Sequence, residues 1–207
     1  MNRFLAFVTQ PERDLAKALG ALPGVTLARS SGPLLPGSFG PADHVVDVVG
    51  GDATQVGEAI VRRTRSALVA VLHELDGAAP EPALAPAVKR VLVFTVADGT
   101  PPVTVARFER ALARMPQHIP AIRSWSLSRV ERVAGDVVWT HAWEQEYVDL
   151  ASFRTYMDSP YHWGVIEPWF DHEFPQAIVE PQLAQVFYDV DRSLLASAGR
   201  SVPCPAT

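Results

Sequence analysis

A tyrosine and a histidine lie six residues apart in the stretch Tyr156-Met157-Asp158-Ser159-Pro160-Tyr161-His162. An imidazole such as that of His162 titrates near neutral pH, as a base that removes a proton next to a carbonyl group must. The phenol of Tyr156 could donate a hydrogen bond to the enolate oxygen that forms, or orient the imidazole. Pro160 interrupts the helical pattern, so periodicity does not fix the distance between the two rings. In the alternative interpretation His162 is structural and ties the turn to a sheet.

Large aromatic residues are confined to one part of the chain. All five tryptophans and all four tyrosines lie between residues 125 and 188. Alternation along an expected strand at residues 137–147 places one set of them on a single face. We predict that a flat apolar or aromatic molecule contacts the following residues: Trp139, His141, Trp143, Tyr147, Phe108 and Trp163. Ordinary packing of aromatic residues in a strand is the alternative.

The sequence predicts neither a metal site nor a cofactor. Asp171-His172-Glu173 has the residue types of a metal site, but three consecutive helical residues point in different directions. The paired spacing His-x-x-x-His is absent, as are a phosphate loop and a dinucleotide fingerprint. The single cysteine, Cys204, excludes disulfide frameworks and thiolate metal sites.

Composition and charge favour a globular cytoplasmic protein. The chain has 207 residues, of which 48% are hydrophobic, and a net charge of −5. Basic residues form no run beyond pairs such as Arg62-Arg63, which argues against nucleic acid as a partner. No apolar stretch approaches the roughly 20 residues that span a bilayer, so we expect no membrane association. The short apolar run at the N-terminus soon reaches Pro11 and lacks the features of a secretory signal.

Two segments of similar sequence indicate an internal repeat. The strand-like run Arg3-Phe4-Leu5-Ala6-Phe7-Val8 is similar to Arg90-Val91-Leu92-Val93-Phe94-Thr95. Each is followed by patterns of helix, strand, strand and helix. In the first half these patterns lie at residues 11–22, 25–28, 44–49 and 53–75. In the second half they lie at residues 103–115, 122–130, 137–147 and 150–157. This order predicts an α+β fold made of tandem ferredoxin-like β-α-β-β-α-β repeats.

We therefore expect two domains and two connecting or terminal segments. The predicted division is a degenerate ferredoxin-like domain at residues 1–76, a Pro/Ala-rich linker at 77–87, an α/β-barrel domain at 88–191 and a flexible tail at 192–207. Helices cover one face of a ferredoxin-like sheet, and the apolar other face needs a second sheet. The resulting barrel could close within one chain as an internal pseudo-dimer, or between two chains as a homodimer.

The second half resembles a known family, the stress-responsive dimeric α/β-barrel (Dabb) domain. The resemblance rests on the run Trp139 to Asp149, on Phe153-Arg154-Thr155-Tyr156 and on Ser159-Pro160-Tyr161-His162, and it covers residues 88 to 190. The family includes a plant polyketide cyclase, whose catalytic tyrosine and histidine correspond to Tyr156 and His162. Two positions depart from that pattern: a histidine of the first strand is Arg90, and a pocket tyrosine is Leu112.

Three functions follow from these observations. The favoured hypothesis is a stress-responsive α/β-barrel (Dabb) protein that binds a small apolar or aromatic metabolite in a pocket of the barrel without transforming it. The first alternative is a cofactor-free polyketide cyclase or lyase that uses His162 as the general base and Tyr156 as the acid. The second alternative is a haem-binding or haem-degrading barrel, because related ferredoxin-like barrels include such enzymes.

Overall fold

The strands of this chain form a single curled antiparallel sheet. The computed structural model describes residues 2–79, 83–136 and 138–197. Within these residues the sheet has eight strands in the order β2-β3-β1-β4-β6-β7-β5-β8. Each set of four, taken in chain order, is arranged 4-1-3-2 with its second and third strands adjacent, which is the ferredoxin-like topology. The predicted fold class, tandem ferredoxin-like repeats, is confirmed.

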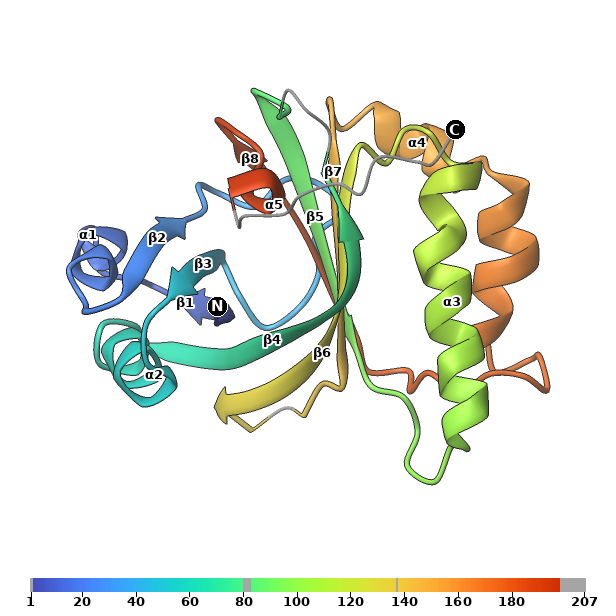
Figure 1. The fold of residues 1–207 in the computed structure, drawn as a ribbon, viewed down its shortest axis with the longest axis horizontal. Coiled ribbons are helices and arrows are strands. Elements are labelled where there is room, and N and C mark those ends of the chain that lie inside the picture. Colours follow the sequence, from blue (N-terminus) through green and yellow to red (C-terminus); the bar gives the residue numbers. More distant parts are fainter. Residues whose placement is uncertain (1, 80–82, 137, 198–207) are drawn as a thin grey trace.

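Four strands and two helices follow one another in the same order, β-α-β-β-α-β, in both halves (Figure 1). The first half consists of β1 (Arg3–Thr9), α1 (Leu15–Gly20), β2 (Val25–Ser30), β3 (His44–Gly50), α2 (Ala53–Arg62) and β4 (Ser66–Ala78). The second half consists of β5 (Ala87–Phe94), α3 (Pro102–His118), β6 (Ser124–Ala134), β7 (His141–Tyr147), α4 (Ser152–Met157), a π-helical turn η1 (His162–Ile166), a 3-10 turn η2 (Glu167–Trp169), β8 (Ala184–Val190) and α5 (Leu194–Ser197).

Strand β4 corrects the prediction of one long helix at residues 53–75. Helix α2 ends at Arg62, and the chain then enters a strand of 13 residues. The run Leu68-Val69-Ala70-Val71-Leu72 pairs with β1 on one side, and from Val69 onward it also pairs with β6 on the other. These two ladders satisfy its backbone groups on both edges, and branched side chains suit a pleated surface. Strand pairing therefore outweighs the helical spacing of the apolar residues.

The two halves are joined along one seam and approach each other again at the opposite edges of the sheet. The long strands β4 and β6 pair from Val69–Ala134 to Ala78–Trp125. Strands β2 and β8 lie at the ends of the strand order. Instead of β2, the loop that follows it meets β8: the backbone N–H of Leu35 donates to Phe187 O (2.8 Å), and that of Phe39 donates to Gln185 O (2.7 Å). The first half thus supplies a loop that covers the edge strand of the second.

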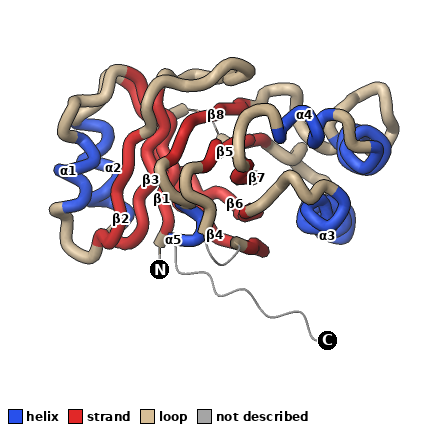
Figure 2. Tube along the Cα trace, turned by 90° about the horizontal axis from the view of Figure 1, so that it is seen from above, coloured by secondary structure: helices blue, strands red, loops and turns tan. Residues whose placement is uncertain are grey.

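The buried side chains form three cores. Figure 2 shows from above the sheet and the helices between which these cores lie. One core lies between the first half of the sheet and helices α1 and α2, and includes Phe4, Leu19 and Ile60. A second lies between the second half of the sheet and α3, with Phe108 and Trp143 among its members. The third lies between the two halves of the sheet. Strands β5 and β7 are therefore buried on both faces.

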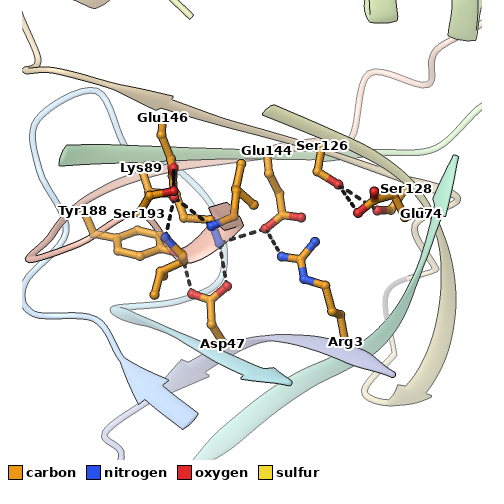
Figure 3. A network of polar contacts seen from close by, with 12 residues as sticks. Arg3, Asp47, Glu74, Lys89, Ser126, Ser128, Glu144, Glu146, Tyr188 and Ser193 are labelled. Atoms are coloured by element: carbon orange, nitrogen blue, oxygen red, sulfur yellow. Dashed lines mark hydrogen bonds and ion pairs between the residues drawn. The ribbon is translucent and has the colours of Figure 1, made fainter. Parts of the chain in front are cut away.

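A network of ion pairs occupies part of the space between the two halves (Figure 3). Lys89 Nζ contacts Asp47 and lies 2.8 Å from Glu144 Oε1, and Arg3 Nη2 lies 2.9 Å from the same oxygen. Burial works to lower the pKa of Lys89, but Asp47 and Glu144 outweigh it and raise that pKa. Nearby, Tyr188 Oη donates to Asp47 (2.7 Å). The interior between the halves is therefore partly charged, whereas the sequence predicts an apolar sheet face there.

The predicted linker and tail are described only in part. Strand β4 continues to Ala78 and β5 begins at Ala87, so the predicted linker at 77–87 overlaps both strands. At the other end Ser193 is buried and donates to Glu146, which also accepts from the backbone N–H of Leu194 (2.7 Å). Residues 80–82 of the linker and 198–207 of the tail, including Cys204, lie outside the described residues. The predicted domain boundaries stay predictions.

Candidate functional site

A cavity lies between the second half of the sheet and the helical segments that cover it. Its volume is about 320 Å³. Strands β5, β7 and β8, helices α3 and α4, and the turns η1 and η2 contribute to its wall. The lining is mostly apolar, and its members include Arg90, Leu92, Leu112, Trp143, Phe153, Tyr156, Met157, His162, Trp163, Ile166, Glu167, Phe170, Leu183 and Gln185.

Side-chain alternation explains which strand residues reach this cavity. On β5, Arg90 and Leu92 face the helices, whereas Lys89 and Val91 face the space between the halves. On β7, Trp143 faces the helices, and its neighbours Ala142 and Glu144 face the other way. The cavity and the ion-pair network therefore lie on opposite faces of the same two strands.

The Ser-Pro-Tyr turn and η1 bring His162 next to Tyr156. The backbone N–H of Glu167 bonds to His162 O, the spacing of a π-helical turn, which is often found at functional sites. Tyr161 anchors this turn to α3, because its hydroxyl donates to Ala111 O (3.0 Å) and its ring stacks on His118 (centroids 4.1 Å apart). The rings of Tyr156 and His162 lie 4.6 Å apart between centroids. Sequence reasoning singled out this pair without being able to give its distance.

Burial and a neighbouring cation keep the imidazole of His162 uncharged. Burial first, and the positive charge of Arg90 second, lower the pKa of His162 to about 4. Its Nδ1 is covered and has no hydrogen-bond partner among the described residues. Its Nε2 lies 3.8 Å from Glu167 Oε2. At neutral pH the side chain is therefore a neutral imidazole, the form that can accept a proton, but its pKa lies well below the near-neutral range expected from the residue type.

Arg90 is buried behind Tyr156 and is held by two amide groups. Its Nε donates to Gln185 Oε1 (2.8 Å), its Nη2 donates to the same oxygen, and its Nη1 donates to Gln145 Oε1. The guanidinium carbon lies 4.9 Å from the ring centroid of Tyr156 and 5.2 Å from that of Phe153. Both distances are within the range of cation–π attraction.

Among the aromatic residues predicted to bind a ligand, two line this cavity. Trp143 forms part of its wall and is fully buried. Trp163 also lines it, is 51% exposed, and donates its ring N–H to Met157 O. The structure thus brings Trp143 and Trp163 together with Tyr156 and His162.

The other four predicted residues are not in the cavity wall. Phe108 and Tyr147 are buried in the core between sheet and helices, and burial raises the pKa of Tyr147 well above its ordinary value. His141 stacks on Phe94 and its Nε2 lies 3.2 Å from Glu109 Oε1. Burial lowers the pKa of His141, and its bond to Glu109 acts in the opposite direction.

Trp139 lies on the other side of the sheet. It packs against Phe7 of β1, with ring centroids 5.0 Å apart, in the core between the two halves. Strand β7 begins only at His141, so the alternation expected from residue 137 onward does not extend to Trp139. Val137, at the start of the predicted strand, lies outside the described residues.

Several lining residues were missed by sequence reasoning. Gln185 and Leu183 come from β8 and the segment before it, and Phe153 comes from α4. Arg90 and Leu112, the two departures from the family pattern, both line the cavity. Those departures were the available signal, because a family position that lines a pocket still lines it when its residue type changes.

Other features of the described residues bear on function. Outside α3 a separate groove is lined by Arg107, Arg110 and Arg114, and all three are exposed. Across residues 2–79, 83–136 and 138–197, no three histidine, cysteine or acidic side chains gather closely enough to hold a metal ion. No helix in the same residues combines the length and apolarity needed to cross a bilayer.

Comparison with known families identifies the second half. Residues 88–179 match the model of the Dabb family, described as the stress responsive A/B barrel domain. Residues 88–179 form a Dabb domain. The resemblance stated from the sequence is therefore confirmed for this part of the chain, and the Dabb domain contains the whole Tyr156–His162 segment. No curated protein matched the sequence.

Solved structures are similar to the whole chain or to about half of it. An anthrone oxidase-like protein is 13% identical, with 99% of this chain and 96% of that chain covered and a TM-score of 0.59, which shows the same fold across both halves. A dimeric ferredoxin-like protein from Bacteroides fragilis NCTC 9343 is 21% identical (50% and 96% covered, TM-score 0.40). A Dabb family protein from Mesorhizobium loti MAFF303099 is 18% identical (50% and 95% covered, TM-score 0.40).

Proposed function

We propose that the cavity of the Dabb domain binds a small apolar or aromatic metabolite. The observation that supports this most directly is the aromatic and aliphatic wall around Tyr156 and His162. The volume of about 320 Å³ lies at the lower end of the usual range for small-molecule sites, roughly 300–1,000 Å³. A flat ring could pack against Trp143 and Phe153, and the few polar groups would orient it.

Tryptophan fluorescence tests this proposal, because Trp143 and Trp163 line the cavity. Titration with a library of polyketides and phenols should produce saturable quenching in the wild-type protein. Leu183→Trp should weaken binding at least about tenfold by filling the cavity near its partly exposed edge. The matched control Val165→Trp, on the separate groove outside α3, should leave affinity unchanged. Equal binding by both variants would refute the assignment of ligand to this cavity.

A second candidate function is proton transfer without a cofactor, supported by the pairing of Tyr156 with a neutral His162. Because Nδ1 is covered, we infer that Nε2 would take the proton from the carbon next to a substrate carbonyl. The electron pair of that C–H bond would move onto the carbonyl oxygen, and the Tyr156 hydroxyl would donate to the resulting enolate. The enolate carbon could then attack a second carbonyl carbon and close a ring, as in an aldol addition. The electron pair of that C=O bond would move onto its oxygen, which would take back the proton held by Nε2.

Replacement of His162 separates the two candidate functions. In the catalytic case His162→Ala should lower turnover by about 100-fold or more, because general bases contribute that much. In the binding case mass spectrometry should show the bound compound unchanged after long incubation with the wild-type protein. Conversion that persists in His162→Ala would exclude His162 as the base.

Haem binding and assembly stay predictions with simple tests. Added haemin should shift the Soret band if the haem hypothesis is correct, and an unshifted band would reject it.

The two halves of one chain already share a sheet, so we propose that the barrel is an internal pseudo-dimer. Light scattering should then give the chain mass of 22.5 kDa, whereas a doubled mass would indicate a homodimer.

A further inference from the structure

Arg90 is a buried cation, and the hydrogen-bond partners that it has among the described residues are all neutral. Only 4% of its surface is exposed, and its three nitrogens donate to the amide oxygens of Gln145 and Gln185. The aromatic rings of Tyr156 and Phe153 cover it. In the part of the chain that the structure describes, no carboxylate lies within ion-pair distance of its guanidinium.

The other buried cations of this sheet are paired with carboxylates. Lys89, the residue before Arg90 on β5, contacts Asp47 and Glu144, and Arg3 pairs with Glu144 at 2.9 Å. Burying a charge without an opposite charge is strongly unfavourable, and amide oxygens offset only part of that cost. Among the described residues, the cations between the two halves are therefore paired with carboxylates, whereas Arg90 in the cavity wall has neutral partners.

We propose that Arg90 recognises an anionic group of the ligand, so that the metabolite bound in this cavity is an apolar or aromatic carboxylate. This inference rests on the proposed binding function of the cavity and adds the charge of the ligand. The planar guanidinium matches a carboxylate in geometry, and such charge-assisted hydrogen bonds are among the strongest in proteins. An incoming carboxylate would supply the counter-charge that the described residues do not.

The remaining charged groups of the wall are compatible with an anion. His162 is neutral at physiological pH, so it neither attracts nor repels a carboxylate by charge. Glu167 is the one carboxylate among the cavity-lining residues described, and its side chain is 36% exposed beside His162 Nε2, where solvent weakens its repulsion. Arg90 therefore sets the preference for charge in the buried part of the cavity.

The first half of the chain helps to hold Arg90 in place. Gln185 accepts from Arg90 through its Oε1, and its Nε2 donates to Gly37 O (3.3 Å) in the loop that covers β8. The same loop bonds to β8 through the backbone of Phe39. Both ends of the Gln185 amide are thereby hydrogen-bonded, which holds the guanidinium at the cavity wall.

Calorimetric titration with matched probes tests the inference. Each pair consists of an aryl carboxylate and its carboxamide, such as 1-naphthoate and 1-naphthamide, across a graded range of ring sizes. The wild-type protein should bind the carboxylate about tenfold or more tightly than the amide. Arg90→Gln should remove that preference, Arg90→Lys should keep part of it, and the control Arg110→Gln in the outer groove should keep all of it.

The outcomes distinguish this inference from the proposed function. Equal affinity of the wild-type protein for acid and amide, with both weakened by Leu183→Trp, would overturn the role of Arg90 and leave the binding site in place. Absence of saturable binding by every pair would overturn both. A preference that survives in a folded Arg90→Gln variant would also contradict the inference. NMR spectra check that the Arg90→Gln variant is folded. In that variant the pKa of His162 should rise from about 4, because the positive charge of Arg90 is one of the two causes that lower it.

Discussion

At the scale of single residues, the two proposed functions depend on three side chains that line one cavity. His162 is neutral, Tyr156 lies beside it, and Arg90 supplies a positive charge behind the phenol ring. The sequence indicated the first two by residue type and spacing. Their distance could not be predicted, because Pro160 breaks the helical pattern and the π-helical turn that follows is anchored by contacts of Tyr161 with distant residues on α3.

The protonation of His162 can be measured directly. NMR titration should show one histidine with a pKa of about 4, far below the ordinary value near 6.5. The pKa of His162 is lower in the folded than in the unfolded state. Its contribution to the free energy of unfolding is therefore fully present above about pH 6.5 and is lost as the pH falls toward 4. The variant His162→Gln should lose that part of the pH dependence of unfolding. A His162 that titrates near 6.5 would contradict the buried, cation-facing environment.

At the scale of elements, pairing between distant segments decided what local patterns left open. The helix expected at residues 53–75 ends at Arg62, because the following residues pair with β1 and β6. The faces of β7 were separated correctly by alternation, but both are buried, so the pattern could not tell which one faces the helices. A strand buried on both sides carries no polar face to orient it.

The contact between α2 and β6 gives a prediction at this scale. A Cβ atom at Gly57 would lie 2.5 Å from Val133 Cγ1. Gly57→Ala should therefore lower the free energy of unfolding by about 1 kcal/mol, although alanine normally favours a helix over glycine. The control is Gly164→Ala in η1, where nothing lies within 4 Å of the added atom, and no loss is expected. Urea denaturation measures both, and a more stable Gly57→Ala protein would contradict close packing here.

At the scale of the whole molecule, two ferredoxin-like halves share one sheet. The repeat of strand and helix patterns allowed this architecture to be predicted from the sequence. The ion-pair network in the space between the halves could not be predicted in this way, because its members lie on four different strands: Arg3, Asp47, Lys89 and Glu144. Only the pairing of those strands brings the charges together, and it leaves the cavity of the Dabb domain on the opposite face.

The ion-pair network should contribute to stability as a unit. Lys89→Met removes the cation and leaves Asp47 and Glu144 buried with less compensation. Loss of one partner of a buried pair typically costs about 3–5 kcal/mol, so the unfolding free energy should fall by about 3 kcal/mol. Arg62→Met, which breaks the exposed pair with Glu58, should change it by less than about 0.5 kcal/mol. Equal effects of the two substitutions in urea denaturation would show that the network is not structural.

The crystal structure of a complex with the tightest-binding aryl carboxylate tests the central claim most directly. The aromatic ring of the ligand should lie between Trp143 and Phe153 and next to His162. The carboxylate of the ligand should lie within hydrogen-bond distance of Arg90. A ligand found between the two halves of the sheet, or in the groove outside α3 with this cavity empty, would contradict it.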